Sequence, residues 1–503
     1  MLMEENDSAT SGDAIKIFSR REFLRQSLYA GVALGAGFKS LRASSYLRII
    51  GANNDIRVAI VGMRIKGADH IEVFRNLPGV RVVALCEVDQ ELLTREAQKF
   101  KDRNEEIDTY KDIRELLDDK NIDAVVIATP NHWHALMGIW ACQAGKDVYV
   151  EKPVSHNIWE GRKLVEAVRK YNRIVQAGTQ NRSDVGFADA AVYLREGNLG
   201  KILWAHSVWY GERQGIGRVT QPQSVPANID YNLWTGPAPL APLMRQSLHY
   251  DWHWFWETGS GEMGNWGPHQ VDDCRFAMNL SGLPKRVMSF GGRFAFDDNA
   301  ETPNTHIAIL DYQPAPVIIE IRNLPTAKGQ RVMDHLRGVR GGNIIHCEHG
   351  YFAGGRGGGW AYDNDGNKLK QFSGDGGGTH QANFIAAVRS RKSSDLRAEI
   401  LEGHFTSLLC HVANISYRLG KTASPEQMRE EIYPHQQAKE TLERFCEHLL
   451  QNGVDLQKQP TIWGPWLTLD AEKEKFVGKF SSEANKYLTR RKYRKPFVVP
   501  KKV

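Results

Sequence analysis

The 503-residue sequence contains few cysteines and no pattern that uses them. Its six cysteines are widely spaced, and no two of them are separated by only two residues. This spacing excludes a zinc ribbon, a Cys-x-x-Cys redox motif and a disulfide framework. It does not decide the redox compartment.

Long apolar runs are also missing. The mildly apolar stretch from Ser27 to Phe38 has about a dozen residues, whereas a membrane-spanning helix needs about 20. It follows Arg20 and Arg21, and an arginine pair before a short Gly/Ala-rich run resembles a twin-arginine export signal. A basic amphipathic helix is the alternative. We expect a periplasmic or secreted protein with no integral membrane segment in the mature chain, and a cytoplasmic location is less favoured.

A strong charge of one sign is absent, since 65 basic residues face 59 acidic ones for a net charge of +6. Much of the excess lies in residues 486–502, KYLTRRKYRKPFVVPKK. No nucleic-acid-binding motif accompanies this tail, so we expect a solvated arm or an oligomer contact and no nucleic-acid partner.

What the sequence does contain is a regular alternation over its first 180 residues. Apolar strands are predicted at 56–62, 80–86, 124–128, 148–150 and 174–177, with helices at 89–102, 111–119, 134–144 and 158–171. This β-α-β order predicts a parallel sheet with right-handed crossovers.

The turn after the first strand carries part of a dinucleotide-binding fingerprint. Gly62 and Gly67 occupy its first and last glycine positions, and Arg64 replaces the middle glycine. Backbone amides here, including that of Met63, would face a pyrophosphate. Glu87, at the end of the second strand, suits ribose hydroxyls and repels a 2′-phosphate, so NAD is favoured over NADP. Arg64 keeps NADP as the alternative.

Polar side chains follow each later strand at the same predicted edge. We assign cofactor contacts there because open α/β sheets bind ligands at the carboxyl ends of their strands. Lys152 precedes a proline that must end its strand. The residues assigned in this way are Thr129, Pro130, Asn131, His134, Glu151, Lys152 and Gln180.

Aromatic residues are concentrated at 249–257. If this segment is extended, Trp252, Trp254 and Trp256 share one face and would suit the apolar surface of a sugar ring. A packed core strand explains the pattern equally well. A metal site at His249 and His253 is less favoured, because two imidazoles at this spacing on a strand do not converge.

A candidate general base follows. Pro268 predicts the first turn of a helix, with His269 at its start and Asp272 and Asp273 on the same face. A carboxylate beside an imidazole orients it and raises its proton affinity. A purely structural histidine is the alternative.

Taken in order, these motifs resemble the Gfo/Idh/MocA oxidoreductases over about residues 50–420. The export signal and residues 399–420, EILEGHFTSLLCHVANISYRLG, resemble secreted, mostly sugar-related members. The family's conserved lysine falls on Lys152 and its histidine on His269. Its aspartate falls on Asn265, which is a departure, and Asp272 or Asp273 could replace the missing carboxylate.

The resemblance implies a fold and a domain order. We expect an α/β protein with an N-terminal Rossmann doubly wound parallel sheet and a C-terminal α/β domain with a large, mostly antiparallel open sheet. The latter is supported by strand-like alternation at 286–372. The domain bounds are 1–48 for a signal or tether, 49–180 for NAD binding, 181–425 for substrate and oligomerisation, and 426–503 for a C-terminal helix and basic arm.

The resemblance also implies a function. The main hypothesis is NAD(P)-dependent oxidation of a ring hydroxyl of a sugar, glycoside or cyclic polyol by a homodimer or homotetramer, with tightly bound NAD and no metal. Catalysis is assigned to Lys152 and His269. A redox-neutral glycosidase or epimerase with self-recycled NAD is the alternative, and a non-catalytic NAD-binding protein is a third. Substrate contacts are assigned to Lys152, Arg182, Trp252, Trp254, Asn265, His269 and Asp272.

Overall fold

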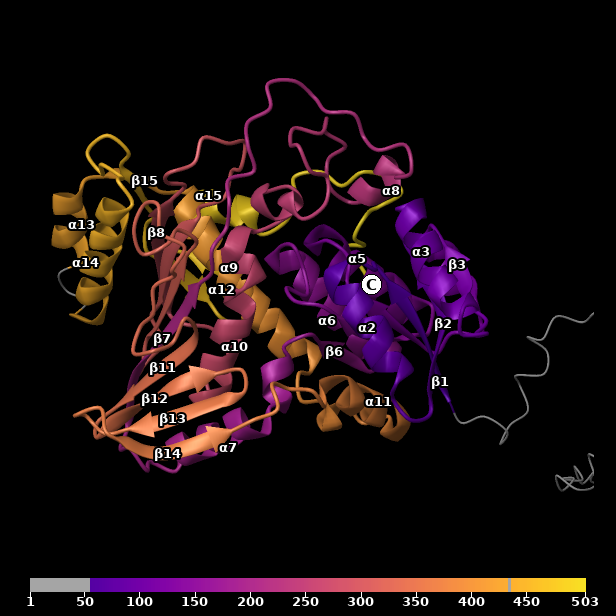
Figure 1. Cartoon of the computed structure of the whole chain (residues 1–503), viewed down its shortest axis with the longest axis horizontal. Coiled ribbons are helices and arrows are strands. Elements are labelled where there is room, and N and C mark those ends of the chain that lie inside the picture. The colour runs from indigo at the N-terminus through magenta and orange to yellow at the C-terminus, as the bar shows by residue number, and fades with distance from the viewer. Residues whose placement is uncertain (1–54, 433–435) are drawn as a thin grey trace, which may run out of the picture. The chain divides into compact units, whose positions relative to one another are not determined.

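The computed structural model describes residues 55–432 and 436–503, and the expected export signal lies outside them (Figure 1). The first part is a six-stranded, all-parallel sheet of order β3-β2-β1-β4-β5-β6, which is the Rossmann order. The predicted doubly wound sheet is therefore confirmed. Its strands are β1 (Ile56–Val61), β2 (Val80–Cys86), β3 (Asp108–Tyr110), β4 (Ala124–Ile127), β5 (Asp147–Val150) and β6 (Val175–Ala177).

Helices cover both faces of this sheet, and its apolar strands are therefore buried on both faces. One apolar core forms under α2 (Ile65–Arg75), α3 (Gln90–Lys101) and the late helix α11 (His380–Ser390). The other forms under α4 (Ile113–Asp118), α5 (Asn131–Gln143) and α6 (Ile158–Tyr171).

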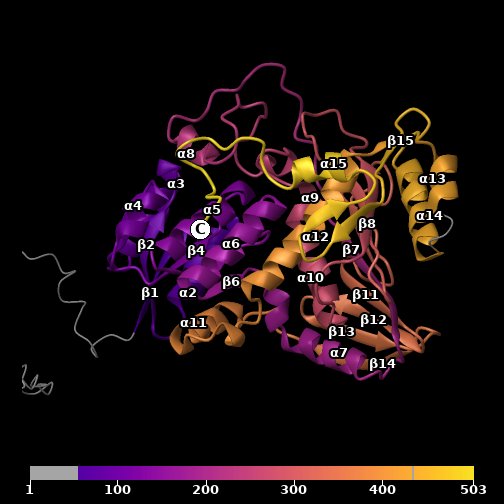
Figure 2. The same cartoon turned by 180° about the vertical axis from the view of Figure 1, so that it is seen from behind.

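The C-terminal arm also packs on the Rossmann unit, so the expectation of a solvated arm is wrong for its described contacts, whereas the oligomer contact stays a prediction (Figure 2). Phe497 and Val499 are buried in the core under α4, α5 and α6. The hydroxyl of Tyr493 donates to Glu160 Oε1 over 2.7 Å, and Arg494 donates to the carbonyl of Gly236 over 2.9 Å. The arm therefore completes the domain from the far end of the chain.

The second sheet has twelve strands and is antiparallel except where β10 pairs with β7 in parallel. The predicted large, mostly antiparallel sheet is confirmed. Its path runs β14-β13-β12-β11-β7-β10-β9-β8-β16-β15, and β17 joins at β8 with β18 beyond it. The strands are β7 (Ile202–Tyr210), β8 (Arg286–Gly292), β9 (Thr305–Leu310), β10 (Val317–Arg322), β11 (Gly341–Cys347), β12 (Gly350–Gly355), β13 (Gly358–Tyr362), β14 (Lys368–Ser373), β15 (Lys421–Ala423), β16 (Thr461–Trp463), β17 (Leu467–Asp470) and β18 (Lys475–Val477).

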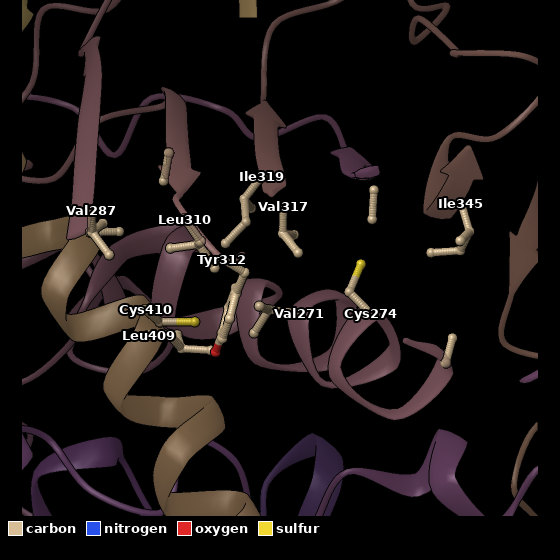
Figure 3. Close-up of a cluster of buried hydrophobic side chains, with 14 of the residues drawn as sticks. Val271, Cys274, Val287, Leu310, Tyr312, Val317, Ile319, Ile345, Leu409 and Cys410 are labelled. Carbon is tan, nitrogen blue, oxygen red and sulfur yellow. The ribbon is translucent and has the colours of Figure 1, made fainter. Parts of the chain in front are cut away.

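Helices pack on both sides of this sheet. The largest core lies between the sheet and α7 (Val185–Arg195), α10 (Gly267–Ala277) and α12 (Ile400–Arg418). Figure 3 shows Val271 and Cys274 of α10 pointing toward Val317, Ile319 and Ile345. This packing fixes the position of the helix that begins beside His269. On the other side, α13 (Pro425–Ile432) and α14 (Gln436–Gln451) cover β8, β9 and β10.

Two segments are more ordered than the sequence suggests. From residue 425 on, the described part of the chain forms three α-helices, the last being α15 (Ser481–Ala484), and three strands of the large sheet, whereas we expected one helix and an arm. The glycine-rich segment 354–359 forms the turn of the β12–β13 hairpin and the paired strand ends beside it. Nowhere in residues 55–432 and 436–503 is a helix both long enough and apolar enough to cross a bilayer.

Candidate functional site

A cleft of about 540 Å³ opens at the carboxyl ends of the Rossmann strands. This is the edge at which open parallel sheets bind ligands. Segments of the second half of the chain close its other side. Eleven of the twelve residues predicted to contact the cofactor line it, namely Gly62, Met63, Arg64, Glu87, Thr129, Pro130, Asn131, His134, Glu151, Lys152 and Gln180.

Gly67 is the twelfth, and it is a packing residue. A Cβ at this position would lie 1.8 Å from the carbonyl oxygen of Gly62, so the helix α2 touches the turn before it. Gly62 has φ +81° and approaches the backbone of Ala128. Both outer glycines of the fingerprint therefore serve the tight turn and close helix packing. Arg64 is exposed at the start of α2 and lines the cleft.

Glu87 is placed by three backbone amides. Its carboxylate accepts hydrogen bonds from the amides of Met63 at 3.1 Å, Val88 at 2.8 Å and Asp89 at 3.2 Å. Burial nevertheless raises the pKa of Glu87. The carboxylate faces the cleft after β2, at the position that suits a ribose.

Glu151 is a buried residue of the cleft lining. It receives His70 Nε2 at 2.9 Å and Gln180 Nε2 at 3.0 Å, both on Oε1. Burial opposes its ionisation, but the hydrogen bond from His70 and nearby positive charges hold the pKa of Glu151 well below its usual range. Its oxygens are therefore committed to the protein, which anchors Lys152 beside it.

Lys152 points across the cleft to the second half of the chain. Its Nζ donates to the carbonyl oxygen of Asn265 at 2.7 Å and to Oδ1 of the same residue at 3.1 Å. Burial lowers the pKa of Lys152. The peptide bond to Pro153 is cis. Asn265 ends the short helix α9 (Gly261–Asn265), two residues before α10 begins.

Asn265 also connects Lys152 to a buried carboxylate. Its Nδ2 donates to Glu262 Oε2 at 3.0 Å, and the other oxygen of Glu262 pairs closely with Arg213. Burial raises the pKa of Glu262. The negative charge expected from an aspartate at position 265 is thus supplied by Glu262, one helical turn earlier.

His269 lines the same cleft as Lys152, at the start of α10 as predicted. Burial and the positive charge of Lys152 lower the pKa of His269 to about 3. The imidazole is therefore neutral near pH 7 and can accept a proton. Its ring lies 5.6 Å from that of Trp266, which stacks on Trp209 at 3.5 Å.

Neither of the carboxylates expected beside His269 forms a hydrogen bond with it. Asp272 is buried, accepts from Arg182 Nε at 2.7 Å and from Thr406 Oγ1 at 2.6 Å, and does not line the cleft. Asp273 accepts from Asn181 Nδ2 at 2.7 Å. The interpretation of Asp272 or Asp273 as the replacement carboxylate is wrong, because both are committed to other partners. Arg182 is likewise outside the cleft lining.

The extended interpretation of the tryptophan segment is also wrong. Residues Asp251–Trp254 form a 3₁₀ helix, so alternate indoles do not share a face. Trp252 lines the cleft, whereas Trp254 is buried outside its lining. His253 lines it too, and its Nδ1 donates to the carbonyl oxygen of Tyr250 at 2.5 Å.

Cleft-lining residues of the irregular region between β7 and α9 cover the cleft and form its roof. The sequence did not predict most of them. Asp89 tethers this region, accepting from Asn228 Nδ2 at 2.7 Å and lying 3.2 Å from His249 Nε2. The cleft-lining residues missed after β7 are Arg213, Leu233, Trp234, His249, Tyr250, His253, Trp266 and Arg356. Lys66 and Asp69 were also missed, although their place in the first turns of α2 was a usable signal.

Comparison with known families identifies two segments. Residues 56–179 match the family described as "Oxidoreductase family, NAD-binding Rossmann fold", and residues 200–287 match its "C-terminal alpha/beta domain", both of the Gfo/Idh/MocA group. The order of these matches agrees with the two sheets described above.

Curated relatives are distant and match in part. An inositol 2-dehydrogenase 1 of Saccharopolyspora erythraea is 33% identical over 155 residues, 30% of this chain and 45% of that protein. A levoglucosan dehydrogenase of Pseudarthrobacter phenanthrenivorans is 27% identical over 47% of this chain and 57% of that protein. A glycosyl hydrolase family 109 protein 1 of Shewanella sp. strain MR-4 is 27% identical over 38% and 46%. The chain therefore spans about half the length of the relatives it matches.

Solved structures share the fold. The WlbA dehydrogenase of Bordetella pertussis, determined with NADH and UDP-GlcNAcA, superposes with a TM-score of 0.54 at 18% identity over 72% of this chain and 97% of that one.

Proposed function

We propose that this protein oxidises a ring hydroxyl of a sugar, glycoside or cyclic polyol with a nicotinamide cofactor, as supported by the match of residues 56–179 and 200–287 to the Gfo/Idh/MocA oxidoreductase models. The observation that carries the proposal is the convergence of Lys152 and His269 on one cleft. They come from different domains, and both line the space in front of the strand ends. Relatives named as inositol and levoglucosan dehydrogenases support the substrate class.

The residues of the cleft fit the cofactor. The turn at Gly62 and the start of α2 suit a pyrophosphate, and Glu87 suits ribose hydroxyls. A carboxylate at Glu87 favours NAD, while the exposed guanidinium of Arg64 keeps NADP open. When bound, the nicotinamide supplies the hydride acceptor.

The proton chemistry belongs to the protein. The ammonium of Lys152 would stabilise negative charge on the substrate oxygen, since a positioned cation in a closed site contributes several kcal/mol. The neutral imidazole of His269 would accept the hydroxyl proton. Glu262, acting through Asn265, would hold Lys152 in place and favour its charged form.

Substituting Lys152 by Met tests this assignment. We expect the variant to bind NADH with unchanged affinity and to lose turnover by about 10²–10³-fold on a panel of sugars and cyclic polyols. The substitution Lys101→Met, at an exposed position in the last turn of α3, is the control. Turnover at the normal rate in the Lys152 variant would contradict the assignment.

The redox-neutral alternative is supported by two features. Relatives carry the name glycosyl hydrolase family 109, and the roof tethered to Asp89 would slow cofactor exchange. Release of nitrophenol from nitrophenyl glycosides without added NAD, and with no net formation of reduced nicotinamide, would favour this alternative over the dehydrogenase.

Export and assembly remain part of the proposal. We propose that residues 1–48 direct the folded protein to the periplasm and that the mature protein is a homodimer or homotetramer. Replacing Arg20 and Arg21 by lysines and following the protein in cell fractions tests the first, and light scattering of the purified protein tests the second.

A further inference from the structure

The glycine-rich hairpin turn at residues 354–359, GGRGGG, presents a single side chain, that of Arg356. Arg356 lines the cleft that also contains Lys152 and His269. Neither the dinucleotide fingerprint nor the proposed proton chemistry uses this turn. Arg356 therefore has no role in the function proposed above, although it lines the same cleft.

The turn is held in place by the protein. Asp184 Oδ2 accepts the amides of Gly357 at 2.9 Å and Gly376 at 2.5 Å, which ties two glycine-rich loops to the start of α7. Arg356 Nε then donates to the carbonyl of Gly376 at 3.0 Å. Gly358 has φ +95°, and a Cβ there would lie 1.9 Å from the carbonyl oxygen of Phe372. Only glycine fits, so the arginine sits on a built turn and not on a loose loop.

The bond from Nε orients the guanidinium and leaves its two terminal amino groups available. Within the described part of the chain, no carboxylate forms an ion pair with Arg356. Its charge reaches the cleft, since it contributes to lowering the pKa of His269.

The acidic groups at this end of the cleft cannot neutralise it. Glu151 is buried and committed to His70 and Gln180, and Glu262 is buried and paired with Arg213. Asp69, which also lines the cleft, pairs with Lys66 at 3.7 Å. The accessible charge around the reacting position is therefore positive, from Lys152 and Arg356. An electropositive cleft favours an anionic ligand.

We propose that the substrate of this site is a sugar acid and that Arg356 binds its carboxylate. This inference rests on the proposed function and narrows its substrate class. The two free amino groups of a guanidinium match the two oxygens of a carboxylate in a bidentate pair. Arg356 is thus a specificity-determining residue, whereas Lys152 and His269 act at the reacting hydroxyl.

The test compares matched ligands by calorimetric titration of the NADH-loaded protein, so no turnover is required. The ligands are D-glucuronate and D-galacturonate, the neutral sugars D-glucose and D-galactose, and D-glucose 6-phosphate. We expect at least one uronate to bind at least about 10-fold more tightly than its neutral counterpart. Arg356→Gln should abolish that preference, with about a 10- to 100-fold loss for the uronate and none for the neutral sugar. Arg356→Lys should retain part of it, because lysine keeps the charge without the fork.

Arg340→Gln, an exposed arginine before β11 that does not line the cleft, is the matched control and should change nothing. Equal binding of acidic and neutral sugars by the wild-type protein, or no binding of any uronate, would overturn the proposal. Preference for the 6-phosphate would replace the carboxylate by a phosphate and overturn it too. A loss of NADH affinity in Arg356→Gln would assign the arginine to the nucleotide instead. Failure of the proposed function is distinguishable, because it would appear as turnover by the Lys152 variant.

Discussion

Replacing Gly67 by alanine tests whether helix propensity or tertiary packing has the larger effect on the stability of the protein. Gly67 lies inside α2, where exchanging glycine for alanine normally stabilises a helix by about 1 kcal/mol. The structure predicts the opposite, because the added Cβ would lie 1.8 Å from the carbonyl oxygen of Gly62. Carbon and oxygen atoms normally approach no closer than about 3.3 Å. The helix would have to move outward by roughly 1.5 Å to restore such a contact.

The obstructing atom belongs to the backbone, so no rotamer change relieves the clash. Overpacking in a well-packed region costs about 1–3 kcal/mol and occasionally more. We place the cost for Gly67→Ala at the upper end, about 3 kcal/mol. Since α2 carries Arg64 and Lys66 at the cleft, its displacement should also weaken NADH binding.

Urea unfolding gives the change in the free energy of unfolding, and quenching of protein fluorescence gives the NADH affinity. Gly145→Ala is the control, because Gly145 has φ +79° and no neighbouring atom within 4 Å. It should cost only about 1–2 kcal/mol for the left-handed backbone and leave NADH binding unchanged. A Gly67→Ala protein as stable as the wild type would refute the packing argument.

Two further predictions concern charge. Glu262→Gln removes a negative charge that favours protonated Lys152. The pKa of Lys152 should therefore fall, and the alkaline limb of kcat/KM should move to lower pH. An unmoved limb would contradict the effect of Glu262 on Lys152. Hydrogen bonding to His404 and the charge of Arg162 outweigh burial and lower the pKa of Glu474 from 4.5 to about 2. Because this folded-state pKa is depressed, the stabilisation, up to about 3 kcal/mol, is present above about pH 4.5 and is lost as the pH falls through 2. In Glu474→Gln, unfolding free energies measured between about pH 5 and 2 should lose this dependence.

The sequence by itself determined the Rossmann half and most of its cofactor contacts. Strands buried on both faces read as apolar runs, and the polar residues that follow them must lie at one edge of a parallel sheet. This local rule brought Glu87, Thr129 and Lys152 to the same cleft without any knowledge of distant contacts.

The tertiary structure decided which side chains pair over long distances in the sequence, because local periodicity carries no information about distant partners. The partners of Asp272 come from segments far away in the chain, so sequence spacing suggested a carboxylate for His269 that the fold uses elsewhere. Helix α11 and the C-terminal arm complete the Rossmann cores although they follow the second domain. The roof of the cleft and the placement of Arg356 depend on irregular or glycine-rich segments whose course is set by single long-range hydrogen bonds, and such bonds leave no periodic trace in the sequence.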